Sequence, residues 1–345
     1  MIKQQLHTSG MSHSTRNELL LFSGLPASGK TTEALKWVAE DPDARLRVNY
    51  DDMRLAWFGP SWKFNRGDED KIQKAARSTV QTALTKGLSV VIDNTNLSSR
   101  VRDKWVNLGK SLGAEVVEQE FDTPIAECKL RDQKREGTSR VGWAVIDWMA
   151  LNHGFINWDD RSIYNREKFI VVDMDGTLSD CEWRRHFVRG ETIHYDFCPT
   201  LTSSEPVHFV GGHCVSCHTP KFKKDWKSFF EGVEKDPPNL PVLNLVKHLC
   251  YFGYDLLIVS GRPMDQCGKG TEAWLRKYLL EAGILPRHLF MRRGNDSRSD
   301  VEVKQEICDL LPKDRIAYVL DDRSSVVEMW RKNGLTCLQV ADGNF

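Results

Sequence analysis

The sequence lacks any apolar run long enough to cross a membrane. Although 40% of its 345 residues are hydrophobic, no stretch approaches the roughly 20 apolar residues that a transmembrane helix needs. The first residues, MIKQQLHTSGMSHSTRNE, contain neither an apolar signal core nor an Arg-rich amphipathic pattern. We therefore expect a protein that has no membrane contact and works in the cytoplasm.

An excess of charge of one sign and a disulfide framework are also missing. The chain has 48 Lys and Arg against 48 Asp and Glu, so contacts with nucleic acid must come from local basic patches. The nine Cys are scattered without the spacing of a disulfide-rich fold. That distribution predicts free thiols, most of them buried.

Length and hydrophobic patterning predict two α/β domains. A chain of 345 residues exceeds the size at which a single core usually stops growing. Strand-like and helix-like segments alternate, which favours parallel sheets wrapped by helices. A polar stretch separates two such series, so we place the domains at 1–160 and 161–345, with a cap insertion at about 181–241. The expected strands are 19–23, 45–49, 89–92, 115–121, 169–172, 255–259 and 316–320, and the expected helices include 31–40, 68–86 and 100–112.

The segment GLPASGKT follows an apolar strand and precedes a helical stretch. Its glycines let backbone N–H groups turn toward phosphates, Lys30 can bridge the β- and γ-phosphates, and the Thr31 hydroxyl can hold Mg²⁺. An ordinary tight turn is the alternative. The context of strand and helix favours an ATP site that includes Gly24, Ser28, Gly29, Lys30 and Thr31.

Asp51 is the strongest candidate for activating the hydroxyl that would receive the phosphate. It follows the expected strand 45–49, at the sheet edge where α/β proteins bind ligands. Its carboxylate can accept the proton of the attacking hydroxyl. The alternative is that Asp51 or Asp52 only caps the next helix.

Two further features of the first half suit phosphoryl transfer. The apolar strand 89–92 is followed by Asp93, as a Mg²⁺-organising carboxylate would be. Arg131 and Arg135 are spaced as neighbours on one helix face, where they can clamp the transferring phosphoryl group as a lid. A solvated helix face is the alternative for the two arginines.

A second set of motifs follows the expected strand 169–172. In DMDGTL, Asp173 and Asp175 point the same way if the backbone stays extended. One carboxylate can then attack phosphorus while the other protonates the leaving oxygen, with Mg²⁺ screening their repulsion. Further phosphate and Mg²⁺ contacts are expected, in chain order, from Ser260, Arg262, Lys304, Asp321 and Asp322.

The order GLPASGKT with DDMR, then DMDGTL, SGR and LDDR, resembles the polynucleotide kinase-phosphatases of the T-even bacteriophages. The resemblance covers most of the chain and includes the ending LDDRSSVVEMWRKNGLTCLQVADGNF. It implies a P-loop kinase domain followed by a Rossmann-like phosphatase domain of the haloacid dehalogenase superfamily. The implied enzyme transfers the ATP γ-phosphate to 5′-hydroxyl ends of RNA or DNA. It also removes 3′-phosphates and 2′,3′-cyclic phosphates, upstream of a ligase.

The resemblance also assigns roles to individual residues. In the kinase it implies Asp51 as general base, Arg54 for orienting the acceptor, Arg135 for the phosphoryl group, and Lys30 and Thr31 for ATP. In the phosphatase it implies Asp173 as nucleophile that forms an aspartyl-phosphate, Asp175 as acid and base, Arg262 and Lys304 as phosphate contacts, and Asp173, Asp175, Asp321 and Asp322 at Mg²⁺. It further implies a homo-oligomer, located in the host cytoplasm if a phage encodes it.

The expected cap contains features that the resemblance does not explain. Cys214 and Cys217 form a CxxC flanked by His, which suits either a structural Zn²⁺ or free thiols. Basic residues of the cap, with two aromatic residues between them, can hold a nucleic-acid end or form a solvated face; they are Arg184, Arg185, Arg189, Lys221, Lys223, Lys224 and Lys227 with Phe222 and Trp226. Two rival functions remain open, a metabolite kinase fused to a small-molecule phosphatase and a binding adaptor with inactive sites.

Overall fold

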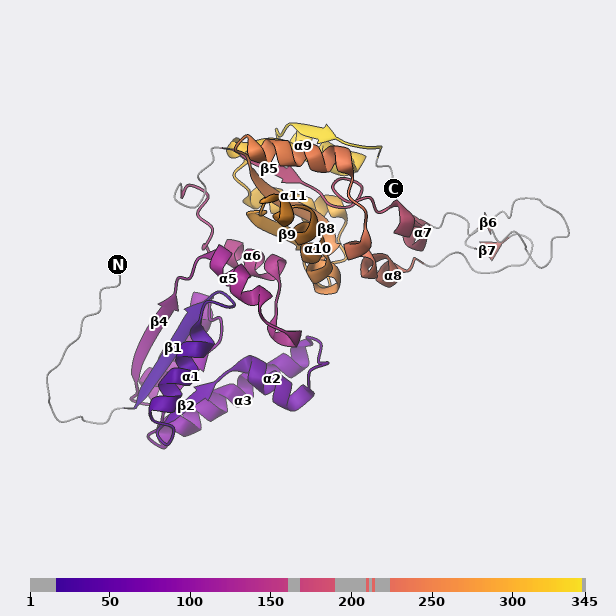
Figure 1. Ribbon diagram of the computed structural model, residues 1–345. Helices are drawn as coiled ribbons and strands as arrows, with labels where there is room; N and C mark the ends of the chain where they lie inside the picture. Colours follow the sequence, from indigo (N-terminus) through magenta and orange to yellow (C-terminus); the bar gives the residue numbers. More distant parts are fainter. Residues whose placement is uncertain (1–16, 161–167, 190–208, 211–212, 215–223, 343–345) are drawn as a thin grey trace. The chain divides into compact units, whose positions relative to one another are not determined.

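The computed structural model describes residues 17–160, 168–189, 209–210, 213–214 and 224–342 (Figure 1). The chain divides into two compact units, an amino-terminal unit that ends at Arg140 and a carboxy-terminal unit that begins at Val141. Each unit has its own parallel sheet and its own hydrophobic core. The prediction of two α/β domains is therefore confirmed. Within the described residues, no helix is both long and apolar enough to span a bilayer.

The amino-terminal unit is built on a four-stranded parallel sheet in the order β2-β3-β1-β4. Its strands are β1 (Glu18–Gly24), β2 (Arg45–Val48), β3 (Ser89–Asp93) and β4 (Glu115–Phe121). Its helices are α1 (Lys30–Glu40), α2 (Tyr50–Phe58), α3 (Arg66–Thr85), α4 (Ser99–Ser111) and α5 (Ile125–Gln133), with a short helix η1 (Gly137–Ser139). Strand β1 is apolar along most of its length because it pairs on both edges and is buried on both faces.

Helices α2 and α3 begin at asparagine caps. The Asn49 and Asn65 side chains accept hydrogen bonds of 3.0 Å from the backbone N–H of Asp52 and Asp68. Such caps satisfy amide groups that the first turn of a helix leaves unpaired. Asn49 therefore fixes the start of α2. Asp51 lies in the first turn, and its carboxylate is not the helix cap.

The carboxy-terminal unit is built on a five-stranded parallel sheet in the order β11-β10-β5-β8-β9. Its strands are β5 (Phe169–Val172), β8 (Asp255–Pro263), β9 (His288–Arg292), β10 (Ile316–Asp321) and β11 (Cys337–Gln339). Its longer helices are α6 (Trp143–Asn152), α9 (Leu240–Tyr251), α10 (Met264–Tyr278), α11 (Asp300–Leu310) and α12 (Ser324–Lys332). Short helices are η2 (Val233–Lys235), η3 (Leu280–Ala282) and η4 (Lys313–Arg315).

Besides η2, the expected cap segment contributes four elements to the described residues. They are α7 (Glu182–Arg189), α8 (Trp226–Glu231) and the antiparallel pair β6 (Phe209–Val210) and β7 (His213–Cys214). The zinc prediction falls on Cys217 and on the side chain of Cys214, which lie outside the described residues and side chains.

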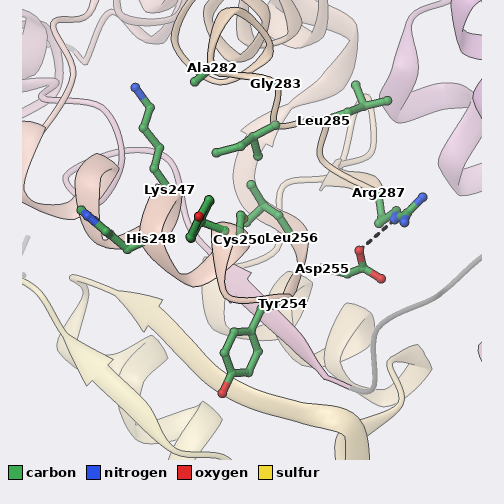
Figure 2. A pocket seen from close by; sticks show the side chains of 12 residues that line it. Lys247, His248, Cys250, Tyr254, Asp255, Leu256, Ala282, Gly283, Leu285 and Arg287 are labelled. Atoms are coloured by element: carbon green, nitrogen blue, oxygen red, sulfur yellow. Dashed lines mark hydrogen bonds and ion pairs between the residues drawn. The ribbon is translucent and has the colours of Figure 1, made fainter.

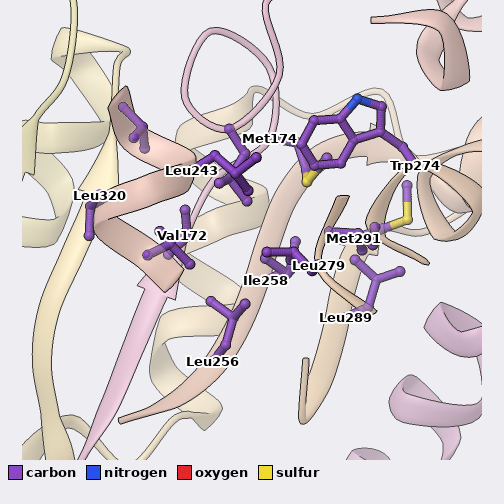
Figure 3. Packing of buried hydrophobic residues seen from close by; sticks show 14 of the residues in the cluster. Val172, Met174, Leu243, Leu256, Ile258, Trp274, Leu279, Leu289, Met291 and Leu320 are labelled. Atoms are coloured by element: carbon purple, nitrogen blue, oxygen red, sulfur yellow. The ribbon is translucent and has the colours of Figure 1, made fainter. Parts of the chain in front are cut away.

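The main core of the carboxy-terminal unit lies between the sheet and helices α9 and α10 (Figure 3). Val172, Ile258 and Leu320 from three neighbouring strands pack with Leu243 of α9 and Trp274 of α10. All of these side chains are buried, and each fully buried aliphatic side chain stabilises a fold by roughly 1.5–3 kcal/mol. This packing fixes the strand ends that carry the polar residues described below.

Helix α6 packs on β9 and α10 and therefore belongs to the carboxy-terminal unit. The Trp148 Nε1–H donates to the Met291 carbonyl at 2.7 Å, and the Asp147 carboxylate lies 2.7 Å from His288 Nδ1. Asp147 also accepts a 2.9 Å hydrogen bond from the Leu289 backbone N–H. The units thus divide before α6, whereas the sequence places the functional boundary at residue 160, which stays a prediction.

Candidate active sites

The loop between β1 and α1 has the backbone of a phosphate-binding loop. Gly24 has a φ of 148°, and a Cβ there would lie 2.8 Å from the Phe121 carbonyl oxygen, so only glycine fits. Gly29 has a φ of 107° and caps α1, whose first N–H groups remain open to an anion. The predicted strand, loop and helix arrangement is thus present.

Lys30 is folded back into this loop. Its Nζ donates to the carbonyls of Gly24 (2.9 Å) and Leu25 (2.7 Å) and to Ser28 Oγ (3.1 Å). Burial lowers the pKa of Lys30 to about 8, against the opposing effect of the Asp93 charge. Among the described residues, the hydrogen-bond partners of this ammonium group are neutral oxygens, so the phosphates of ATP are stronger acceptors for it. These residues, with Thr31 next in the helix, fit a nucleotide triphosphate with Mg²⁺.

The predicted general base lies at the carboxyl end of β2, in the first turn of α2. The Asp51 side chain is 84% exposed and forms an ion pair with Arg54. Arg54 is itself fixed by Glu69, to which its Nε and NH2 donate at 2.9 and 2.7 Å. The structure therefore brings Asp51 and Arg54 together and leaves the carboxylate accessible to an acceptor.

Asp93 and Asn94 hold the start of α2 against the sheet. Asp93 is 1% exposed and pairs with Arg47 Nε at 2.8 Å. The Asn49 side chain donates to the Asp93 carbonyl, and Asn94 Oδ1 accepts a 2.9 Å hydrogen bond from the Tyr50 backbone N–H. These contacts position Asp51 indirectly, while the predicted Mg²⁺ role of Asp93 stays a prediction.

The two arginines predicted to form a lid differ in their surroundings. Arg131 NH1 lies 3.4 Å from the Ser28 carbonyl and therefore reaches the phosphate loop. Helix α5 ends at Gln133, so Arg135 follows the helix and the expectation of one shared helix face is wrong. Arg135 NH1 donates to the Ser139 carbonyl at 3.4 Å, and its charge helps to lower the Lys30 pKa.

In the carboxy-terminal unit, Asp173 follows β5 directly and lies beside Lys304. Lys304 Nζ is 2.9 Å from Asp173 Oδ1 and 2.8 Å from Asp321 Oδ2, and the lysine is almost fully buried. Burial raises the pKa of Asp173 well above its usual range; Lys304 opposes this, while Asp321 and Asp322 add to it. The Lys304 pKa is raised in turn, because its carboxylate partners outweigh the cost of burial.

Asp173, Asp321 and Asp322 form a group suited to a divalent cation. One oxygen from each lies within 4.8 Å of the others, and all three residues are buried. Asp322 Oδ2 accepts no hydrogen bond, and burial with the nearby Asp321 charge raises the Asp322 pKa to about 6. Lys304 and, at 3.7 Å from Asp322 Oδ2, Arg185 face these three carboxylates, so negative charge is in excess. A hard cation such as Mg²⁺, which prefers oxygen ligands, would balance this excess of negative charge.

Gly176 lets the loop after Asp175 approach this group. Its φ is 77°, and a Cβ there would lie 2.1 Å from Asp322 Oδ2. Any other residue would displace that carboxylate, so the glycine of DMDGTL is required by close packing as well as by backbone conformation.

The Asp175 carboxylate points away from the three-carboxylate group, toward two buried arginines. Arg262 donates to it from Nε at 3.0 Å and from NH2 at 2.5 Å, and Arg184 NH2 forms a second ion pair. Burial alone would raise the Asp175 pKa, but Arg262 and Arg184 outweigh it and hold the pKa well below its usual range. Asp175 is not part of the group of Asp173, Asp321 and Asp322, and its predicted contact with Mg²⁺ stays a prediction. Arg262, predicted to bind phosphate, here binds Asp175.

Three residues of this site were missed or misinterpreted from sequence. Arg184 was expected on a basic surface that either holds a nucleic-acid end or is solvated, and both expectations are wrong because its side chain is 0% exposed and pairs with Asp175 and Asp236. Asp236 lies in a Pro-rich loop that carries no motif. Asp300 pairs with Arg292 and Arg323 at the start of α11, where the capping box of Ser299 with Glu302 gave a usable signal.

A separate pocket of about 630 Å³ opens at the beginning of β8, the end opposite to Arg262 (Figure 2). Figure 2 shows Lys247 and His248 of α9 facing it, together with the ion pair of Asp255 and Arg287 at 3.0 Å. Because ligands of open α/β sheets bind beyond the carboxyl ends of the strands, this pocket is not the catalytic centre.

Family models match both parts of the chain. Residues 19–155 match the model of an AAA domain, and residues 223–345 match that of the phosphatase domain of polynucleotide kinase PNKP. One structure of the Pnkp1/Rnl/Hen1 RNA repair complex is similar over 96% of this chain and 97% of that chain, with 25% identity and a TM-score of 0.35. A second structure of the Pnkp1/Rnl/Hen1 complex is similar over 98% and 100%, with 26% identity and a TM-score of 0.35.

A third similar structure is the Mycobacterium tuberculosis APS kinase CysC in complex with AMPPNP and APS. Its sequence identity is 20%, over 34% of this chain and 70% of that chain, with a TM-score of 0.29. The family models agree with the two sites described above, one in each unit. The chain thus joins an amino-terminal P-loop kinase domain of the AAA type to a carboxy-terminal haloacid dehalogenase-like phosphatase domain of the polynucleotide kinase type.

Proposed function

We propose that this chain heals the ends of nucleic acids by phosphorylating 5′-hydroxyl groups and removing 3′-phosphates. The observation that supports this best is the match of residues 223–345 to a polynucleotide kinase phosphatase domain, on a chain whose other unit carries a phosphate loop with an accessible carboxylate. The same chemistry extends to 2′,3′-cyclic phosphates, which place a phosphorus atom at the same end of the strand.

In the kinase reaction, Asp51 accepts the proton of the 5′-hydroxyl as its oxygen attacks the γ-phosphorus. The bond between this phosphorus and the bridging oxygen breaks, and ADP leaves. Arg54, fixed by Glu69, orients the acceptor next to Asp51. Lys30 leaves the loop carbonyls for the phosphates, and Arg131 and Arg135 approach from the lid. Mg²⁺, when bound with ATP at Thr31, neutralises phosphate charge.

In the phosphatase reaction, an oxygen of Asp173 attacks the phosphorus of the 3′-phosphate, and the bond to the 3′-oxygen breaks. Asp175 supplies the proton that this leaving oxygen needs. Water then attacks the phosphoaspartate, Asp175 accepts its proton, and inorganic phosphate leaves. Asp173, Asp321 and Asp322 would hold Mg²⁺, which would screen the repulsion between carboxylates and phosphate.

The proton on Asp175 requires a change in its ion pairs. In the empty site Arg262 and Arg184 favour the carboxylate form. A substrate phosphate competes for Arg262, and each contact that Arg262 transfers to phosphate raises the Asp175 pKa. The predicted role of Arg262 as phosphate ligand and its observed contact with Asp175 are therefore two stages of one reaction.

The resemblance to the T-even phage enzymes supports the finer parts of this proposal. It favours action before a ligase, in the cytoplasm, by a homo-oligomer. An accessible Asp51 and an intact Lys30 and Asp173 speak against an adaptor with inactive sites. A metabolite kinase fused to a small-molecule phosphatase would use the same phosphate-handling residues.

One experiment separates these functions. The protein is incubated with Mg²⁺, labelled ATP and an oligonucleotide that bears a 5′-hydroxyl and a 3′-phosphate, and both ends of the product are analysed. Label at the 5′ end with loss of the 3′-phosphate supports end-healing. Consumption of ATP and of a generic phosphate ester, with both oligonucleotide ends unchanged, would support the metabolite function instead.

A further inference from the structure

A run of four aromatic side chains lies between α2 and α3, next to the predicted acceptor site. The rings of Trp57 and Phe58 are 6.2 Å apart, those of Phe58 and Trp62 5.8 Å, and those of Trp62 and Phe64 6.2 Å. Phe58 and Trp62 are stacked at 20°, and the other two contacts are edge to face. The four rings therefore form one continuous row, which we call the aromatic row.

Both ends of the aromatic row are exposed, and its two middle rings, Phe58 and Trp62, are only half-buried. Trp57 and Phe64 are 53% and 66% exposed, and Leu55 beside them is 53% exposed. None of the four rings belongs to the hydrophobic clusters that stabilise the amino-terminal unit. Large apolar groups gathered on a surface in this way are typical of a binding site.

The aromatic row is connected to the acceptor site through Arg54. The Arg54 guanidinium lies 5.8 Å from the Trp62 ring centre and is also the partner of Asp51. Trp62 is held in turn by a 3.3 Å hydrogen bond from its Nε1–H to Asp68. A molecule whose hydroxyl reaches Asp51 therefore has the edge of the aromatic row beside it.

The chemistry of the aromatic row suits nucleic-acid bases. Single-stranded nucleic acid binds proteins by stacking successive bases on aromatic rings, which works for every base because each has a π-face. Lys63 and Arg66, in the same segment, are exposed cations that can meet backbone phosphates. A protein partner would need a larger apolar face than one row of rings.

We propose that Trp57, Trp62 and Phe64 form a stacking platform for the first bases of the strand whose 5′-hydroxyl is phosphorylated at Asp51. The proposal rests on the polynucleotide kinase function and deepens it. The platform makes the kinase prefer single-stranded acceptors of several nucleotides over short ones, with little preference for base identity.

The test removes aromatic rings from the protein and bases from the acceptor, separately and together. The kinase rate is measured for the wild-type protein and for Trp57→Ala with Phe64→Ala, on an oligonucleotide with normal bases and on one with abasic sites in its first nucleotides. Loss of a stacking ring typically weakens binding about tenfold. Because the variant lacks two rings, we expect its KM for the normal acceptor to rise by about tenfold to a hundredfold while the KM for ATP stays unchanged. For the abasic acceptor, we expect wild type and variant to have equal KM values.

A matched control is Tyr251→Ala, which removes an aromatic ring that is 86% exposed in the carboxy-terminal unit. We expect this variant to phosphorylate both acceptors as the wild type does. If the variant instead raises the KM for the abasic acceptor by the same factor as for the normal acceptor, the rings do not contact the bases, and the platform is excluded. Failure of the wild type to phosphorylate any oligonucleotide would instead exclude the kinase function, and the platform with it.

The abasic acceptor keeps the test decisive even if the double variant folds poorly, because it needs only the wild-type protein. Equal KM values of the wild type for normal and abasic acceptors would overturn the proposal. The variant Trp57→Phe, which keeps a ring, is expected to restore most of the affinity that Trp57→Ala loses.

Discussion

The two sites differ most in where their charged groups lie. In the kinase unit the Asp51 side chain is 84% exposed, and the phosphate loop holds one lysine among neutral oxygens. In the phosphatase unit Asp173, Lys304, Arg184 and Arg262 are all buried. Each of them already forms an ion pair within the protein, although the group of Asp173, Asp321 and Asp322 keeps an excess of negative charge.

This difference shows two ways of preparing a site for phosphate. In the kinase site, Asp51 is exposed in its ion pair with Arg54 and Lys30 donates to neutral oxygens, so ATP and the acceptor complete the site. The phosphatase site carries a preformed ion-pair network that substrate must rearrange, since Arg262 binds Asp175 until phosphate competes for it. Fixed charges in a buried site interact strongly and need little reorganisation during the reaction.

The largest effect is expected from Asp173→Asn, which removes the only nucleophile that the proposed phosphatase mechanism uses. The rate of 3′-phosphate removal should fall by at least about 10⁴-fold, while phosphorylation of a 5′-hydroxyl stays unchanged. Both activities are measured on the same oligonucleotide. Loss of both activities in a protein whose two units remain folded would contradict two independent sites.

The next effect concerns the exposed carboxylate of the kinase. Asp51→Asn removes the base while preserving shape, and kcat for 5′ phosphorylation should fall by about 10²–10⁴-fold. Asp52→Asn is the matched control, because Asp52 is also exposed but pairs with Arg47. A larger loss for Asp52→Asn than for Asp51→Asn would show that Asp51 is not the general base.

Breaking the buried network should cost stability as well as activity. Lys304→Met leaves Asp173 and Asp321 without their shared cation, and removing one partner of a buried ion pair typically destabilises by about 3–5 kcal/mol. Lys313→Met is the control, because Lys313 pairs with Asp309 at 3.0 Å with its side chain 34% exposed. An exposed pair of that kind contributes about 0–1 kcal/mol.

The comparison is made by urea unfolding of the carboxy-terminal unit, followed by its phosphatase activity or by tryptophan fluorescence. Burial raises the pKa of Asp173, and its protonation removes one unpaired charge, so the deficit of Lys304→Met should shrink as the pH falls. A deficit that is equal for the two lysine variants would show that the network contributes no more than a surface pair.

The smallest effect is a pH dependence of ATP binding. Burial lowers the pKa of Lys30 to about 8 in the empty loop, and phosphates bind the ammonium form. The affinity for ATP should therefore be constant below about pH 8 and decrease by up to tenfold per pH unit above it. Titration calorimetry between pH 7 and 9.5 measures this, and Lys30→Met should bind more weakly with a flat profile in the same range.

Local patterns were sufficient to predict the skeleton of both sites. The expected strands 115–121 and 169–172 coincide with β4 and β5. Strand β4 is largely exposed, whereas β5 is a buried apolar run that its local pattern indicates directly. The phosphate loop and the pair of Asp173 and Asp175 were found for the same reason. Each is a short segment whose residues act together on one turn of backbone.

Contacts between distant segments could not be predicted in this way. Arg184 meets Asp236 across 52 positions of sequence, and neither residue lies in a pattern that indicates burial. A basic helix looks like a solvated surface unless its partner is known. Helix α6 is apolar on most of its circumference, so its periodicity does not show which sheet it covers.

Helix α6 also bears on how the two activities can be separated during evolution. Residues 19–155 match a nucleotide-binding family, yet Trp143 and Trp148, near the end of that range, are buried in the unit that carries the phosphatase. A gene split after residue 155 would leave each product with an incomplete surface, one with a stranded apolar helix and one with an uncovered β9. Helix α6 therefore favours the inheritance of both units as a single reading frame. This holds whatever the advantage of having both activities on one chain.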